Sequence, residues 1–149
     1  MAMPYRKYAA AIIFRKVKHV SLFLLLHRKQ NWRGWEYVKG GLLPGESAIN
    51  GHGGVLFEET GTKKEKVLSK LPMQITYEWP KAFQKDNRKW KGAIQQVYVV
   101  EIFSKNIKLD KKEHSSYKWV TAKAALKLLT YKESKLALRK ALSIKAPCL

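Results

Sequence analysis

The chain has 149 residues and a mass of 17.2 kDa, a size that suits one domain with one core, so we expect a single domain over residues 1–149. A hydrophobic content of 46% supports a globular fold rather than a disordered chain, with disorder expected only at the two ends. A formal net charge of +19 favours polyanions as partners, such as nucleic acid or nucleotide polyphosphates, with a Lys-rich solvated surface as the alternative.

Cysteine usage and hydropathy favour a cytoplasmic protein. The single cysteine, Cys148, excludes an internal disulfide and a Cys-based zinc site. The longest apolar run, residues 20–26, is far below the ~20 residues that cross a bilayer. It also lies too far from the start to be the core of a signal peptide. We therefore expect no membrane segment.

Two apolar stretches, residues 8–17 and 21–27, predict a pair of core strands separated by a polar stretch at Lys18 and His19. Near-continuous apolarity at residues 22–26 indicates burial on both faces, as in a sheet covered by helices on each side. A basic loop at residues 30–34 leads into a short strand at residues 36–38.

Glycines and a proline at residues 40–45 predict a tight loop, after which Glu46 begins a helix that runs to about residue 60. Three glycines at residues 51–54 weaken this helix, since an interior Gly costs about 0.5 to 1 kcal/mol relative to Ala. Residues 73–79 and 93–103 predict two strands joined by a basic hairpin loop. Residues 117–120 suggest a last strand, and residues 122–129 and 132–144 have helical spacing.

An ordered set of glycines, glutamates and one leucine falls within residues 35–62. Its members are Gly40, Glu46, Leu56, Glu58, Glu59 and Gly61. Their spacing resembles the Nudix box, which reads Gly, five residues, Glu, seven residues, Arg-Glu, an apolar residue, any residue, Glu-Glu, any residue, Gly. Gly54 and Val55 occupy the positions of the Arg-Glu pair.

The chain resembles Nudix hydrolases over essentially its whole length, and within them diadenosine tetraphosphate hydrolases and RNA 5′ pyrophosphohydrolases. Residues 35–46, 92–100, 113–119 and 128–131 carry this resemblance. It implies an α/β fold, specifically a Nudix-type α/β/α sandwich with a mixed sheet. It also implies hydrolysis of a nucleoside diphosphate linked to another group, with Mg²⁺ or Mn²⁺ as cofactor.

The resemblance further implies a metal site made by Glu46, Glu58, Glu59 and the carbonyl of Gly40, with Glu58 and Glu59 as catalytic residues. Such a cation neutralises the pyrophosphate and lowers the pKa of the attacking water. The alternative for Glu58 and Glu59 is a pair of solvated helix residues. Glu113 is a further candidate ligand outside the box.

Two positions of the box depart from this chemistry. Helical spacing puts residues 55, 58 and 59 on one face, so Val55 faces the expected metal without an oxygen ligand. Gly54 likewise lacks the Arg side chain that braces the carboxylates in the family. We expect both losses to weaken catalysis. For His114, a surface or hydrogen-bonded histidine is favoured over a catalytic one.

Aromatic and basic residues interleave around the box, as suits base stacking combined with phosphate binding. Lys39 matches a family position close to the substrate phosphates. We predict that Lys39, Arg33, Trp35, Tyr77 and Arg88 bind substrate, with ordinary core packing as the alternative for the aromatic residues.

Two functional hypotheses remain open at this point. The first is a Nudix hydrolase acting on nucleoside polyphosphates or RNA 5′ phosphates, weakened by Gly54 and Val55. The second is a non-catalytic Nudix domain that binds RNA or a ribonucleoprotein such as the ribosome. A peripheral membrane protein is disfavoured, because the basic residues are dispersed and the leucines of residues 132–145 suit packing on the sheet.

Overall fold

The computed structural model describes residues 5–29, 33–41, 65–79, 81, 90–102, 107 and 114–143. In chain order its elements are β1 (Tyr5–Val17), β2 (Val20–Arg28), β3 (Gly34–Glu36), β4 (Val38–Gly41), β5 (Glu65–Glu78), β6 (Gly92–Ile102), β7 (His114–Val120), α3 (Ala122–Leu128) and α4 (Lys132–Ser143). The helix predicted over residues 46–60 lies outside the described residues.

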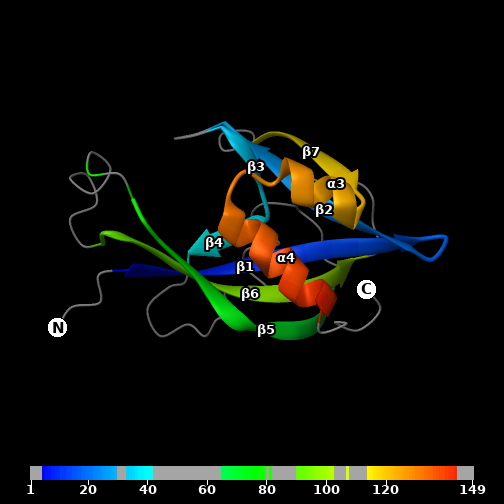
Figure 1. The fold of residues 1–149 in the computed structure, drawn as a ribbon, viewed down its shortest axis with the longest axis horizontal. Coiled ribbons are helices and arrows are strands. Elements are labelled where there is room, and N and C mark those ends of the chain that lie inside the picture. Colours follow the sequence, from blue (N-terminus) through cyan, green and yellow to red (C-terminus); the bar gives the residue numbers. More distant parts are fainter. Residues whose placement is uncertain are drawn as a thin grey trace.

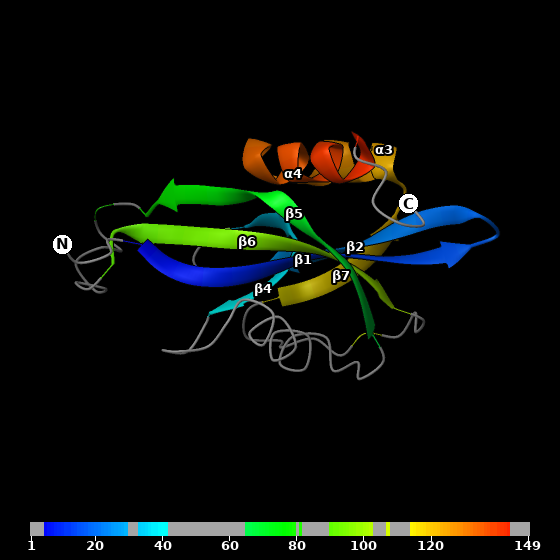
Figure 2. The same cartoon turned by 90° about the horizontal axis from the view of Figure 1, so that it is seen from below.

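The strands form one mixed sheet with the order β3-β2-β1-β6-β5, in which β4 also pairs with β1 and β7 with β2. β1 and β6 run parallel, whereas the other pairs are antiparallel. The predicted pairing of the first two strands is confirmed, because Phe14 lies opposite Phe23. α3 and α4 cover one face of the sheet (Figures 1 and 2). The predicted α/β class with a mixed sheet is therefore confirmed.

Residues 34–41 form two strands where one was predicted. β3 pairs with β2 and β4 pairs with β1, and the chain changes partner at Tyr37. Tyr37 is buried, and its hydroxyl donates to the carbonyl of Ser134 in α4 at 2.6 Å, which anchors the change of partner under the helix. The predicted loop at Gly40 and Gly41 was wrong, because both belong to β4, where Gly40 lies opposite Ala9.

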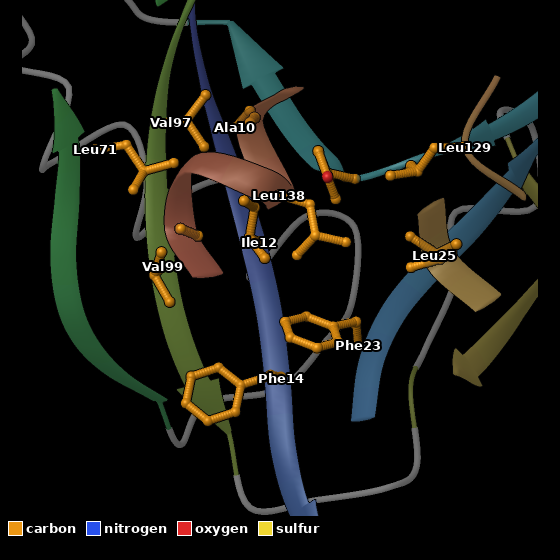
Figure 3. Packing of buried hydrophobic residues seen from close by; sticks show 14 of the residues in the cluster. Ala10, Ile12, Phe14, Phe23, Leu25, Leu71, Val97, Val99, Leu129 and Leu138 are labelled. Carbon is orange, nitrogen blue, oxygen red and sulfur yellow. The ribbon is translucent and has the colours of Figure 1, made fainter. Parts of the chain in front are cut away.

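Both faces of the central strands are buried, as the apolar run at residues 22–26 predicts. Phe23 and Leu25 join the cluster on the helix side, whereas Leu24 and Leu26 join the cluster on the opposite side. Figure 3 shows Leu138 of α4 in the helix-side cluster with Phe23 and Leu25. Within the described part of the chain, no helix is long and apolar enough to cross a membrane.

β5 begins at Glu65, well before the predicted start at residue 73. Its first residues are polar, so the local signal is weak, and pairing with the apolar β6 extends the strand. The register shifts between Lys70 and Gln74, on either side of Pro72, which has no N–H for the ladder. β7 likewise starts earlier than predicted, at His114, because it pairs with β2. Glu78 lies opposite Gly92, which confirms the predicted hairpin.

The turn between β1 and β2 places two non-glycine residues at positive φ, Lys18 at 48° and His19 at 69°. Two-residue hairpin turns with positive φ at both positions favour Asn-Gly, because other side chains are strained there. We expect Lys18→Asn combined with His19→Gly to raise the free energy of unfolding by about 1 to 2 kcal/mol. Urea denaturation measures this change, and Lys16→Asn on the adjoining strand is the control. An unchanged midpoint in the turn variant would contradict the prediction.

Candidate functional site

A buried carboxylate organises the polar groups of β2, β3, β4 and β7. Glu36 is only 5% exposed, and its Oε2 accepts hydrogen bonds from Arg28 at 3.1 Å and from His114 Nε2 at 2.8 Å. Its Oε1 lies 3.1 Å from Nζ of Lys39. Because an ionised carboxylate only accepts, Nε2 of His114 carries the hydrogen. The favoured expectation for His114, a hydrogen-bonded rather than a catalytic histidine, agrees with this geometry.

The charges of Glu36 and Lys39 depend on each other. Burial by itself raises the pKa of Glu36, but Lys39, the hydrogen bond from His114 and Arg28 outweigh it and lower the pKa to about 2. Burial acts to lower the pKa of Lys39, and the Glu36 carboxylate outweighs it and raises that pKa. Both groups are therefore charged at neutral pH, and the Glu36 oxygens are committed to internal partners.

Lys39 connects this carboxylate to a second polar group on the sheet. Its Nζ lies 3.3 Å from the hydroxyl oxygen of Tyr77, which also accepts from Nε2 of Gln95 at 3.1 Å. A hydroxyl has two lone pairs and one hydrogen. Because Lys39 and Gln95 donate to the lone pairs, the Tyr77 hydrogen is left to be donated.

The Lys39 ammonium also has one N–H donor that Glu36 and Tyr77 do not use. It carries three hydrogens, and within the described part of the chain Glu36 and Tyr77 accept two of them. The Lys39 side chain remains 18% exposed, so the third hydrogen is accessible to an incoming acceptor. Lys39 and Tyr77 together offer two hydrogen-bond donors to a single anionic group.

Tyr131, in the turn between α3 and α4, is influenced by the charges of this polar group. Burial raises the pKa of Tyr131, while the positive charge of Lys39 acts on the same hydroxyl in the opposite direction. The residue as a whole is nevertheless 47% exposed. The helical layer therefore supplies an aromatic residue beside the polar group formed by β4, β5 and β6.

Trp35 ties β3 to this turn. Its backbone N–H donates to Oγ1 of Thr130 at 2.8 Å, and the Thr130 N–H donates to the Trp35 carbonyl at 3.2 Å. The indole ring packs against His27, with ring centroids 4.9 Å apart, and Nζ of Lys118 lies 5.2 Å from its centroid. These contacts give Trp35 a structural role, and its predicted part in substrate binding stays a prediction.

Lys39 and Tyr77 are the two predicted substrate-binding residues that the structure brings together. Arg33 is exposed just before β3, where it has no hydrogen bond or ion pair with the other described residues. Arg88 lies outside the described residues.

The metal site stays a prediction. Glu46, Glu58, Glu59 and Glu113 lie outside the described residues, and Gly40 is placed in β4. In the ranges that the structure covers, no group of three His, Cys, Asp or Glu side chains could hold a metal ion. The predicted ligands are carboxylates, the hard oxygen donors that suit Mg²⁺ or Mn²⁺.

Sequence reasoning did not single out Glu36, Arg28 or Gln95. One signal was present, because Glu36 is a rare acid in a basic chain and stands in an apolar surrounding, where an ionised residue must be paired. Its full set of partners was not readable, since β2, β4 and β7 each supply one, and His114 of β7 is 78 residues away.

Comparisons with known proteins agree with the predicted family. Residues 4–141 match the sequence model of the NUDIX domain. The RNA pyrophosphohydrolase of Nitratiruptor sp. is 30% identical over 132 residues, which cover 85% of this chain and 84% of the relative. That of Campylobacter jejuni is 24% identical over 131 residues, with the same coverage.

Solved structures show the same fold. The C. elegans Ap4A hydrolase in a binary complex superposes with a TM-score of 0.79 at 24% identity, covering 95% of this chain and 98% of that one. The dihydroneopterin triphosphate pyrophosphohydrolase of E. coli gives a TM-score of 0.73 at 17% identity, covering 93% and 97%. The domain model that matches residues 4–141 and the relative of 30% identity show that the chain belongs to the Nudix family.

Proposed function

We propose that this protein binds nucleoside polyphosphates or the 5′ phosphates of RNA and hydrolyses them slowly with a divalent metal ion. Its relatives named as RNA pyrophosphohydrolases and the fold it shares with an Ap4A hydrolase support this substrate class. Gly54 and Val55, at the Arg-Glu positions of the box, support the reduced rate. A single Nudix domain over residues 1–149 and a cytoplasmic location belong to the same proposal.

The pair of donors at Lys39 and Tyr77 is the observation that carries the proposal. Phosphate oxygens only accept hydrogen bonds, and both side chains have a hydrogen to donate. Among the described side chains of this group, Arg28 and Lys39 carry two positive charges and Glu36 carries one negative charge. Fixed donors with a positive charge on a sheet are suited to bind a polyphosphate.

The predicted metal ligands fit this scheme in their chemistry. Mg²⁺ or Mn²⁺ held by Glu46, Glu58, Glu59 and the Gly40 carbonyl, with Glu113, would neutralise the pyrophosphate and activate water. Lys39, directly before Gly40 in β4, would hold the phosphates beside those ligands.

Lys39→Gln tests the proposal, since it removes the charge while leaving Glu36 paired with Arg28 and His114. We expect at least about tenfold weaker binding of diadenosine tetraphosphate and of 5′-triphosphorylated RNA, the value of one charged hydrogen bond. Calorimetry measures affinity, and divalent-dependent turnover is followed in parallel. Lys91→Gln is the matched control, because Lys91 is exposed and pairs with Glu78. Unchanged affinity in a folded Lys39→Gln protein would overturn the proposal.

The second candidate function is non-catalytic binding of RNA or a ribonucleoprotein. The loss of the Arg-Glu pair and the net charge of +19 favour it. The same measurements separate the two candidates: a binder would show affinity that falls steeply with salt and no divalent-dependent turnover of either substrate.

A further inference from the structure

The two helices expose a strongly basic surface that is separate from the Lys39 and Tyr77 donors. Residues 121–143 contain six basic residues and one acidic residue, Glu133, a greater excess of positive charge than the chain has as a whole. We call this surface the basic helix face. It consists of Lys123, Lys127, Lys132, Lys135, Arg139 and Lys140.

Helical periodicity gathers these charges on the outer side of the layer. In α4, Ala137, Leu138 and Ala141 are buried against the sheet, whereas Lys132, Arg139 and Lys140 are exposed. Lys132, Arg139 and Lys140 share one side of the helix with the exposed Leu136. These positions are separated by three or four residues or by about two turns. Figure 2 shows α3 and α4 as a layer on one side of the sheet, so this side of α4 faces solvent.

The charges of the basic helix face are not neutralised within the described part of the chain. Among those residues, none of its six members forms an ion pair or a hydrogen bond through its side chain. Six cations without counter-charges attract a polyanion, and they repel one another less once its phosphates lie between them.

The basic helix face begins beside the candidate site and is held there rigidly. Tyr37 bonds the first turn of α4 through the Ser134 carbonyl, and Thr130 bonds both backbone groups of Trp35. Lys132 directly follows the turn whose Thr130 bonds Trp35, and Trp35 adjoins Glu36, which lies 3.1 Å from Nζ of Lys39. A polyanion strand that starts at Lys39 and passes the turn at Tyr131 would therefore reach α4 next.

We propose that the basic helix face binds the body of a single-stranded RNA whose 5′ phosphates occupy the Lys39 and Tyr77 site. α4 has 12 residues and is about 18 Å long, enough to lie along several successive nucleotides. A dinucleotide polyphosphate is too short to use this surface fully. The inference therefore rests on the proposed function for the position of the 5′ end, and it selects RNA as the preferred substrate class.

A triple variant, Lys132→Gln with Arg139→Gln and Lys140→Gln, tests this inference. Its matched control removes three exposed charges along β1 and in the turn that follows it, by Lys7→Gln with Lys16→Gln and Lys18→Gln. Fluorescence anisotropy measures affinity for RNAs of about 4 and about 16 nucleotides. Each RNA is prepared with a 5′ triphosphate and with a 5′ hydroxyl, and salt is varied.

For the longer RNA we expect the triple variant to bind about ten- to a hundredfold more weakly at moderate salt, with the slope of log affinity against log salt smaller by about 2. The control variant and the affinity for diadenosine tetraphosphate should change little. An equal loss in both triple variants would assign the effect to net charge alone and overturn the inference. Unchanged RNA binding with lost binding to phosphatidylserine vesicles would also overturn it, in favour of a membrane surface.

The Lys39→Gln variant and the triple variant together separate this inference from the proposed function. If the donors at Lys39 do not bind phosphate, Lys39→Gln leaves all affinities unchanged, while the triple variant still weakens binding of the long RNA. If the basic helix face does not bind RNA, the triple variant behaves as its control, whatever Lys39→Gln does.

Discussion

Replacing Glu36 by Ala is expected to lower the free energy of unfolding by about 3 to 5 kcal/mol, because it removes the carboxylate that Arg28 and Lys39 both pair with in a buried setting. Arg28 and Lys39 have side chains only 12% and 18% exposed, so water cannot fully replace the carboxylate. His114, 1% exposed, would lose the acceptor of its Nε2 hydrogen. Urea denaturation of the variant and the parent protein measures the loss.

Two further variants show whether charge or shape is responsible. Glu36→Gln keeps the shape but removes the charge, and should recover only part of the loss. Glu78→Gln removes an exposed partner of Lys91, whose Nζ lies 3.5 Å away, and should cost less than about 1 kcal/mol. If Glu36→Ala were no more damaging than Glu78→Gln, the buried carboxylate would not stabilise the fold.

The Glu36 carboxylate also makes the free energy of unfolding depend on pH. Its pKa falls from 4.5 to about 2 on folding, so its contribution is present above pH 4.5 and is lost as pH falls toward 2. The difference corresponds to about 3 kcal/mol. Glu36→Gln has no such group, so the stability gap between it and the parent protein should shrink over this range of pH.

Restoring the missing pair of the box, by Val55→Glu with Gly54→Arg, is expected to raise divalent-dependent turnover by about two powers of ten. The resemblance to the Nudix box places a carboxylate ligand at position 55 and a bracing Arg at 54, and losing a charged catalytic group commonly has an effect of this size. Gly54→Arg also removes an interior glycine from the predicted helix. Turnover of diadenosine tetraphosphate and of 5′-triphosphorylated RNA measures the gain.

Val55→Gln, which offers an uncharged oxygen, is the matched control and should restore much less. Adding Glu59→Gln to the restored protein should abolish the gained activity, since Glu59 is a predicted ligand. A folded double variant with unchanged turnover would show that Gly54 and Val55 are not what limits the reaction.

The sequence by itself determined the family, the strand pairing of β1 with β2 and the burial of both sheet faces. These conclusions depended on local signals, namely residue spacing in the box at 40–61 and continuous apolarity at residues 22–26. Such signals can be identified from the sequence alone, because the residue types themselves indicate burial or a motif. Sequence reasoning also predicted Lys39 and Tyr77 as substrate-binding residues. The structure brings them within hydrogen-bonding distance, and their role in binding stays a prediction.

Only the tertiary structure decided the partners of Glu36 and the path of residues 34–41. Glu36 meets Arg28 from β2 and His114 from β7, whose separation from it along the chain ranges from 8 to 78 residues. No local pattern encodes such pairings, because they follow from which strands adjoin and in what register. The change of partner at Tyr37 is similar, since a hydroxyl bonded to the distant Ser134 fixes it. Net charge and motif spacing can be identified directly from the sequence. The side chains that set the pKa of a buried carboxylate become its neighbours only when the sheet folds.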